Sequence, residues 1–206
     1  MIKKFEKPLK SSFGFLIVFI GLTNIYMNFS KEEKKLYLME KATLFVTDEK
    51  VFEAKVREVS KNLQIPPEWL MAVMYSESRF DANAENLKGS GAIGLIQFMP
   101  ATMPEFGLTK DKLLKMSFEE QLNHVEEYMR RKSKQYGGLK SLTDTYLAIL
   151  YPKAIGKEMC YTLYSKPSKA YKQNVGLDEN KDGIVTVGDI DVRMKRIFPK
   201  AYISKL

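Results

Sequence analysis

The sequence has almost none of the residues that build disulfide frameworks or histidine metal sites. Its 206 residues include one cysteine, Cys160, and one histidine, His124. A single cysteine cannot form an internal disulfide, so the chain is not a disulfide-stabilised scaffold, and we expect Cys160 to be a small core residue. Because no second imidazole is present to share a metal, we expect a surface or core role for His124.

The chain also lacks internal repeats, low-complexity tracts and any long stretch that alternates apolar and polar residues. These absences argue against repeat architectures and against a large half-buried β-sheet. The composition, with 45% hydrophobic and 28% charged residues, is that of an ordinary globular protein. We therefore predict a mainly α fold with one principal domain.

The net charge of +8 favours polyanionic partners such as nucleic acid, anionic lipid or an acidic cell-wall polymer. No basic cluster interleaved with aromatics and no known nucleic-acid motif is present, so we expect no nucleic-acid partner. A solvated lysine-rich surface remains the alternative explanation for the charge.

One uncharged stretch, "SSFGFLIVFIGLTNIYMNF", follows a basic N-terminus. From Phe13 to Phe29 it would span about 26 Å as a helix, slightly less than a bilayer core. Lysines before the stretch predict a cytoplasmic N-terminus and a body outside the cytoplasm, on the periplasmic or cell-wall side. No A-x-A-like cleavage site follows, which favours an uncleaved membrane anchor; a secreted body remains the alternative if the segment is cleaved.

Helical signals run through the body of the chain. Phe52, Val56, Val59 and Leu63 recur at spacings of four, three and four, typical of one stripe of an amphipathic helix, and we expect Thr47 as its N-cap. Further helix starts are predicted at the capping-box pairs Ser117 with Glu120 and Ser141 with Asp144.

The run "IPPEWLMAVMYSESRF" is apolar around most of a helix, with Pro67 suited to its first turn. Such a helix should be buried, yet it carries Glu77 near its last turn. A buried, unpaired carboxylate is costly unless it is neutral or partnered, so Glu77 is a candidate for chemistry.

Two motifs together carry a resemblance to a known family. "ESRF" and, after a loop, "GAIGLIQFMPAT" resemble the lysozyme-like domain of soluble lytic transglycosylases over roughly residues 48 to 160. The resemblance implies that Glu77 is the catalytic residue at the end of a buried helix and that the second motif, with Gln97 and Met99, lines the sugar-binding groove.

The third motif of that family is not intact. "YLAILYPKAIG" stands in its place, where Tyr151 matches the motif tyrosine and Pro152 replaces an asparagine. This pattern resembles a phage-associated branch of these enzymes. Tyr146, five residues earlier, is the competing candidate for the tyrosine of the site.

The resemblance implies cleavage of the MurNAc–GlcNAc β-1,4 bond of peptidoglycan glycan strands with formation of a 1,6-anhydro ring. Glu77 would act first as general acid and then as general base, and Ser78 and Gln97 would offer hydrogen bonds to the sugar. No cofactor is expected for this chemistry, and the chain is expected to act as a monomer. For Gln97, a structural hydrogen bond under the loop is the alternative.

Two other functions fit the same residues. A lysozyme-type hydrolase would use the same glutamate with water, and a catalytically silent glycan-binding or assembly protein would keep only the groove. The altered third motif keeps the silent alternative open.

"DENKDGIVTVGD" near the C-terminus fits the twelve-residue EF-hand calcium loop, with its glycine at position 6. We predict a structural Ca²⁺ site, although the last ligand is aspartate where glutamate is usual; a tight turn with incidental acids is the alternative. The expected ligands are Asp178, Asn180, Asp182, the carbonyl of Ile184, Thr186 and Asp189.

These features predict a division of the chain into four segments. They are a basic N-terminus with a transmembrane segment (1–30), a helical connector (31–46), a lysozyme-like domain (47–175), and an EF-hand-like loop with a C-terminal helix (176–206).

Overall fold

The structure is a computed structural model that describes residues 35–86 and 89–203. The chain divides into two compact units, Met1–Lys35 and Leu36–Leu206. The membrane helix predicted within residues 1–30 lies outside the described residues. Within the described ranges, no helix is both long and apolar enough to cross a bilayer.

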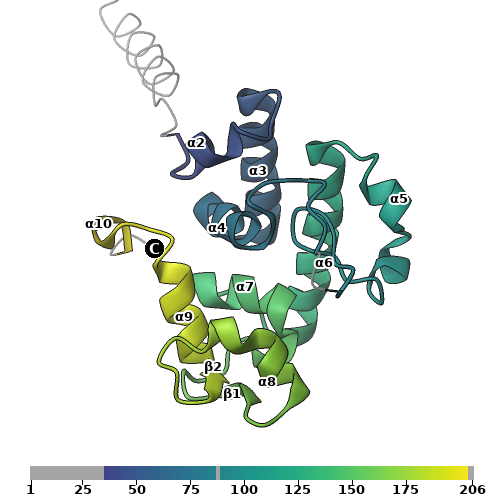
Figure 1. The fold of residues 1–206 in the computed structure, drawn as a ribbon. Helices are drawn as coiled ribbons and strands as arrows, with labels where there is room; N and C mark the ends of the chain where they lie inside the picture. The colour runs from purple at the N-terminus through teal and green to yellow at the C-terminus, as the bar shows by residue number, and fades with distance from the viewer. Residues whose placement is uncertain (1–34, 87–88, 204–206) are drawn as a thin grey trace, which may run out of the picture. The chain divides into compact units, whose positions relative to one another are not determined.

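The described chain is mainly helical, as predicted (Figure 1). In chain order the elements are α2 (Met39–Ala42), α3 (Glu49–Leu63), α4 (Pro67–Ser78), the 3-10 turn η1 (Met103–Phe106), α5 (Lys110–Leu113), α6 (Phe118–Tyr136), α7 (Leu142–Leu150), η2 (Pro152–Ala154), β1 (Thr162–Ser165), α8 (Lys169–Asn174), η3 (Val175–Leu177), β2 (Ile184–Thr186), α9 (Val187–Lys195) and α10 (Lys200–Ile203).

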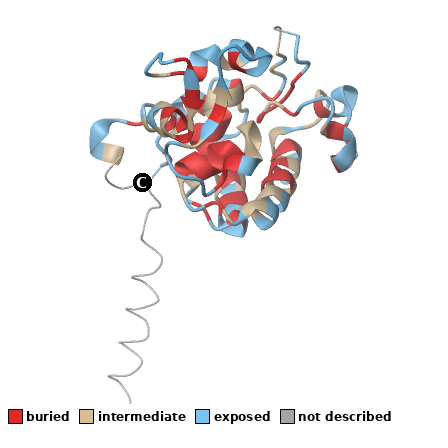
Figure 2. Cartoon of the chain, turned by 90° about the horizontal axis from the view of Figure 1, so that it is seen from below, coloured by how far each residue is buried: buried red, intermediate tan, exposed pale blue. Residues whose placement is uncertain are grey.

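Helix α4 is the buried centre of the helical body. It packs between α3 and α7, while α6 contacts both α3 and α7, and α9 covers α7. Figure 2 shows buried residues gathered where these helices meet and exposed residues around them. The continuous burial from Trp69 to Met74 explains why the sequence of α4 shows no polar face.

The predicted stripe of α3 is confirmed, because all four of its apolar residues are buried. The predicted N-cap is wrong by one residue: Asp48, not Thr47, accepts hydrogen bonds from the backbone N–H groups of Lys50 and Val51. A carboxylate serves this role as well as a hydroxyl and also interacts favourably with the helix dipole.

The capping box of Ser117 with Glu120 is confirmed at the start of α6. At α7 only half of the predicted box forms, since the Ser141 hydroxyl accepts from the backbone N–H of Asp144. The Asp144 carboxylate instead accepts from the backbone N–H groups of Lys140 and Gly156. It therefore ties the loop after η2 back to the start of α7.

A small antiparallel sheet was not expected from the sequence. Strand β1 pairs with β2, with Thr162 opposite Thr186 and Ser165 opposite Ile184, and a bulge interrupts the register. Strands of three or four residues are too short to show alternation. Cys160, just before β1, is exposed, so the prediction of a core cysteine is wrong.

The segment just before α3 takes part in the core. Leu36, Leu38, Met39 and Ala42 are all buried within it. In the described part, the compact unit therefore begins near residue 36, within the stretch predicted as a connector. The proposed segment boundaries remain predictions.

Candidate active site

Glu77 lies in the last turn of α4, where the buried helix reaches the protein surface. Its side chain is half-buried and its carboxyl group is closely surrounded by protein atoms, which raises its pKa from 4.5 to about 7. Burial is the main cause because it disfavours the charged form. A hydrogen bond from Tyr146 and the nearby charge of Arg193 oppose this shift. At neutral pH the carboxyl group is thus poised between its protonated and ionised forms.

The backbone directly after Glu77 turns sharply in a left-handed conformation. Arg79 and Phe80 have φ values of 58° and 72°, which are unusual for residues other than glycine. The Phe80 ring is fully buried, and the Arg79 guanidinium stacks 4.2 Å from the centre of the Tyr75 ring. Packing therefore holds this strained turn, as often occurs beside functional residues.

Tyr146 of α7 is the tyrosine that contacts Glu77. Its hydroxyl interacts by hydrogen bonds with Ser76 and Glu77, and its ring is almost fully buried. Burial raises the pKa of this hydroxyl well above its ordinary value, so it stays protonated and remains a donor at neutral pH. Tyr151 instead packs edge-on against Tyr164, with ring centres 5.7 Å apart. The geometry thus favours Tyr146 over Tyr151 as the tyrosine beside Glu77.

The second motif forms a tight loop beside α4. Backbone hydrogen bonds join Ile93 and Phe98 in both directions, and Gln97 between them has a φ of 54°. The Gln97 amide donates to the carbonyls of Ala84 and Gly94 at 3.0 and 3.2 Å. These bonds favour the structural alternative for Gln97, and sugar binding by Gln97 remains a prediction.

Ser78 joins the two motifs. Its buried hydroxyl contacts the carbonyl of Met74 within α4 and the carbonyl of Leu95 in the loop, at 3.2 and 3.0 Å. The hydroxyl therefore fixes the loop against the helix end that carries Glu77. Its predicted role in sugar binding is not tested by this arrangement.

Met99 follows this loop and has an exposed side chain. With Gln97, Tyr128 and Ile149 it lines a cavity of about 30 Å³, which is too small for a sugar ring. A larger cavity of about 420 Å³ lies between residues 44–48, 81–83 and 116–119, and Glu77 does not line it. Glu77 lines neither of these two cavities.

Gln121 of α6 was missed by the sequence reasoning, although it ties the segment that follows the first motif to the second motif. Its fully buried side chain donates to the carbonyls of Ala82 and Leu113 at 2.8 and 2.9 Å and accepts from the N–H of Leu95 at 3.1 Å. Gly94 packs so closely on this amide that a Cβ would lie 2.8 Å from Oε1. A lone polar residue on the buried face of an amphipathic helix is the signal that could have found it.

The residues of the predicted calcium loop run from the end of η3 into the first turn of α9, away from the two motifs in sequence. Within the described residues, no three histidine, cysteine, aspartate or glutamate side chains gather as a metal cluster. The predicted ligands therefore share one loop without converging on a common point.

Comparison with protein families shows which domain these residues form. Residues 55–154 match the family model described as the transglycosylase SLT domain. This part of the chain is a transglycosylase SLT domain. The match runs from within α3 to the end of η2 and contains Glu77, the second motif, Gln121 and Tyr146. A search of curated proteins gives no match.

The match confirms the resemblance to the soluble lytic transglycosylases and supports that family in general, while the resemblance to a phage-associated branch remains a prediction. The match ends before the calcium-like loop, which lies outside the SLT domain.

Proposed function

We propose that the chain is a lytic transglycosylase that cleaves the MurNAc–GlcNAc β-1,4 bond, with Glu77 as the only carboxyl group in the chemistry. The observation that carries this proposal is the raised pKa of Glu77, in hydrogen-bond contact with Tyr146 at the end of α4. A carboxyl group with a pKa of about 7 can both give and take a proton near neutral pH.

The first step uses the protonated form of Glu77. Its proton passes to the glycosidic oxygen as the bond to the anomeric carbon breaks, and the carbonyl oxygen of the muramyl N-acetyl group attacks that carbon. Tyr146, which stays protonated, donates a hydrogen bond that stabilises the resulting Glu77 carboxylate.

The second step uses the ionised form. The Glu77 carboxylate takes the proton of the sugar's own 6-hydroxyl group, whose oxygen bonds to the anomeric carbon and displaces the acetamido oxygen. The product is a 1,6-anhydro sugar, and Glu77 is protonated again for the next cycle.

Asp81 is the nearest acid in sequence, but it does not fit the role of a second catalytic carboxylate. Its side chain accepts a hydrogen bond from the backbone N–H of Asn83 at 2.8 Å. Asp81 also lines the larger cavity, and Glu77 is not among the residues that line that cavity. Most glycosidases place two carboxyl groups on either side of the bond. Assistance by the substrate's own acetamido group removes this requirement.

Product analysis tests the reaction. Purified peptidoglycan digested with the protein should yield glycan fragments ending in 1,6-anhydro sugars when analysed by mass spectrometry. Reducing ends instead, which are heavier by one water, would identify a lysozyme-type hydrolase. Glycan binding without any fragments would identify the silent binding protein.

We propose further that residues 13–29 anchor the protein in a membrane with its body outside the cytoplasm. The uncharged run and the preceding lysines support this placement. Protease added to spheroplasts should degrade the body, and membrane fractions should contain the intact protein. A body that stays protected in spheroplasts and appears in the soluble cytoplasmic fraction would contradict the proposal.

A further inference from the structure

The C-terminal loop of residues 178–189 contains a buried carboxylate oxygen without a hydrogen-bond partner. Asp178 is only 6% exposed, and its Oδ2 accepts from the Gly183 N–H at 2.9 Å and the Tyr171 hydroxyl at 2.7 Å. The N–H groups of Lys181 and Asp182 also face this carboxyl group, but Oδ1 itself has no bond of normal geometry. Burying a carboxylate oxygen without a partner costs folding free energy unless a cation or a hydrogen-bond donor contacts that oxygen.

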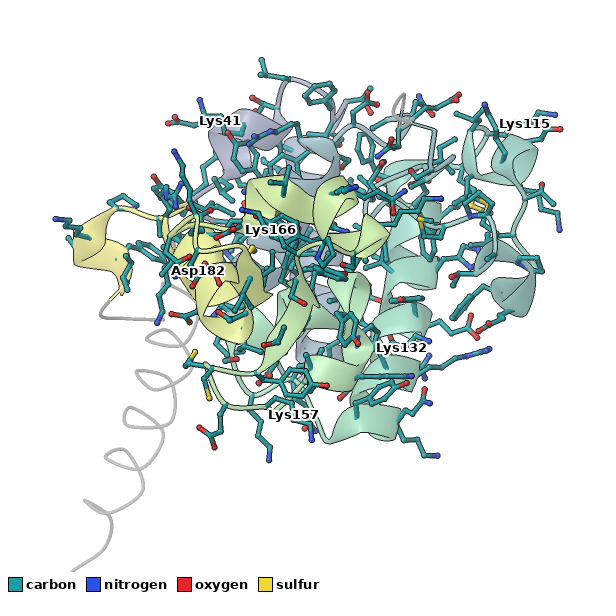
Figure 3. All side chains as sticks on the ribbon, turned by 60° about the horizontal axis from the view of Figure 1, so that its bottom comes forward. Lys41, Lys115, Lys132, Lys157, Lys166 and Asp182 are labelled. Carbon is teal, nitrogen blue, oxygen red and sulfur yellow. The ribbon has the colours of Figure 1, made fainter. Side chains whose placement is uncertain are left out.

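Two features around Asp178 match the calcium-loop pattern. Gly183 stands at position 6, where the pattern requires glycine for a sharp turn, and its N–H binds Oδ2 of Asp178, the residue at position 1. Gly183 has a φ of +93°, as the sharp turn requires, and Lys166 crosses the loop there, within 3.0 Å of where a Cβ would lie. Figure 3 shows Lys166 and Asp182 near each other in this part of the protein.

The remaining carboxylates now bind backbone groups of the loop itself. Asp182 accepts from the N–H of Ile184 at 2.8 Å, and the two oxygens of Asp189 accept from the N–H groups of Glu179 and Thr186 at 3.0 and 2.9 Å. Binding of an ion would replace these hydrogen bonds by contacts between the carboxylates and the cation.

We propose that residues 178–189 bind one Ca²⁺ ion and that the bound ion holds helix α9, with Arg193, beside the Glu77–Tyr146 pair. The ligands are those of the loop pattern: Asp178, Asn180, Asp182, the Ile184 carbonyl, Thr186 and Asp189.

Helix α9 begins inside the loop, because Thr186 is its N-cap and Asp189 lies in its first turn. The helix packs on α7 through the fully buried Ile190 and Met194. A hydrogen bond of 2.9 Å between the Thr143 hydroxyl and Asp191 fixes the same contact. An ion in the loop would therefore stabilise the position of α9. Helix α9 in turn supports α7, which carries Tyr146.

Arg193 connects this module to the candidate active site. Its guanidinium donates to the Gly176 carbonyl at 3.2 Å and lies 3.6 Å from the Glu179 carboxylate, both beside the loop. It is also close enough to Glu77 and Tyr146 to lower the pKa of each. Arg193 is therefore a positioning residue for the charge on Glu77, and this part of the proposal rests on the proposed function.

Calcium binding is tested by measurements that do not depend on glycan cleavage. Titration calorimetry should show one Ca²⁺ per chain, with a Kd of about 10⁻⁴ to 10⁻³ M because Asp189 replaces the longer glutamate. At a hundredfold excess over Kd, the melting temperature should rise by about 5 to 10 °C. Asp182→Ala, at an exposed position, removes a ligand oxygen and should abolish both effects, while Asp111→Ala on α5 should preserve them. No binding to the wild type, or unchanged binding to Asp182→Ala, would overturn the site.

The link to Glu77 is tested by the pH dependence of activity on soluble glycan strands. Arg193→Gln removes a charge that lowers the pKa of Glu77, so the alkaline limb of the profile should move to higher pH. Arg196→Gln, which removes the other arginine paired with Glu179, should leave the limb in place. Chelation of calcium should shift the alkaline limb of the wild type in the same direction and leave the profile of Arg193→Gln unchanged.

The possible outcomes separate the two parts of the proposal. Calcium binding with no such shift would overturn only the link to Glu77. A protein without activity would overturn the proposed function but would not affect the calcium site.

Discussion

Glu77→Gln should lower the rate of glycan cleavage by about 10² to 10⁴ while the protein remains folded. The amide has nearly the same shape as the carboxyl group, but it can neither protonate a leaving oxygen nor take a proton from the 6-hydroxyl group. The rate is measured on purified glycan strands with wild type and variant side by side.

The matched control is Glu68→Gln at the other end of α4. Glu68 lies in the first turn of α4, outside both motifs, and accepts a hydrogen bond from the Tyr202 hydroxyl at 3.0 Å. This variant should cleave at the wild-type rate. Cleavage by Glu77→Gln at a rate near that of the wild type would remove Glu77 from the mechanism.

The stability of Glu77→Gln shows independently that the variant is folded. The pKa of Glu77 rises from 4.5 to about 7 on folding, so its ionisation opposes folding as the pH rises from about 4.5 through 7. Glutamine carries no such penalty. In denaturant titrations at pH 8 the variant should therefore be more stable than wild type, by up to about 3 kcal/mol, with the difference vanishing below pH 4.5.

Gln121→Leu should be the most destabilising polar substitution near the site. Leucine leaves the carbonyls of Ala82 and Leu113 and the N–H of Leu95 buried without their partner. Each unsatisfied group costs about 1 to 3 kcal/mol, and because such costs are not additive we expect a total of about 3 to 5 kcal/mol. The melting temperature should fall by roughly 10 °C.

The same substitution at Gln135, which is exposed on the same helix, is the control for this prediction. Gln135→Leu should change the free energy of unfolding by no more than about 0.5 kcal/mol. Equal melting temperatures for the two variants would mean that the Gln121 amide does not hold the motifs together.

The central helix and its glutamate were predictable because both follow from local sequence. A helix that is apolar on every face has to be buried, and a carboxyl group at its end stands out against that background. The motif spacing then identified the loop that packs beside it. The N-cap of α3 was misplaced by one residue because Thr47 and Asp48 are both good caps, and only the backbone geometry distinguishes them.

Other features depend on contacts between distant segments, which local patterns do not encode. Gln121 is 39 residues from Ala82, one of the residues it binds. Tyr146 and Tyr151 lie on the same short stretch, and only the packing of α7 against α4 brings Tyr146 to Glu77. The pairing of β1 with β2 likewise joins segments that are about 20 residues apart and individually too short to be recognised.

A titration of the Glu77 carboxyl group by carbon-13 NMR, assigned by comparison with Glu77→Gln, tests the central claim most directly. The account predicts a pKa of about 7 in the wild type. In Tyr146→Phe it predicts a higher pKa, because the hydrogen bond that stabilises the carboxylate is lost, and in Tyr151→Phe no change. A wild-type pKa near 4.5 would mean that Glu77 is ionised at neutral pH and cannot be the acid that begins the reaction.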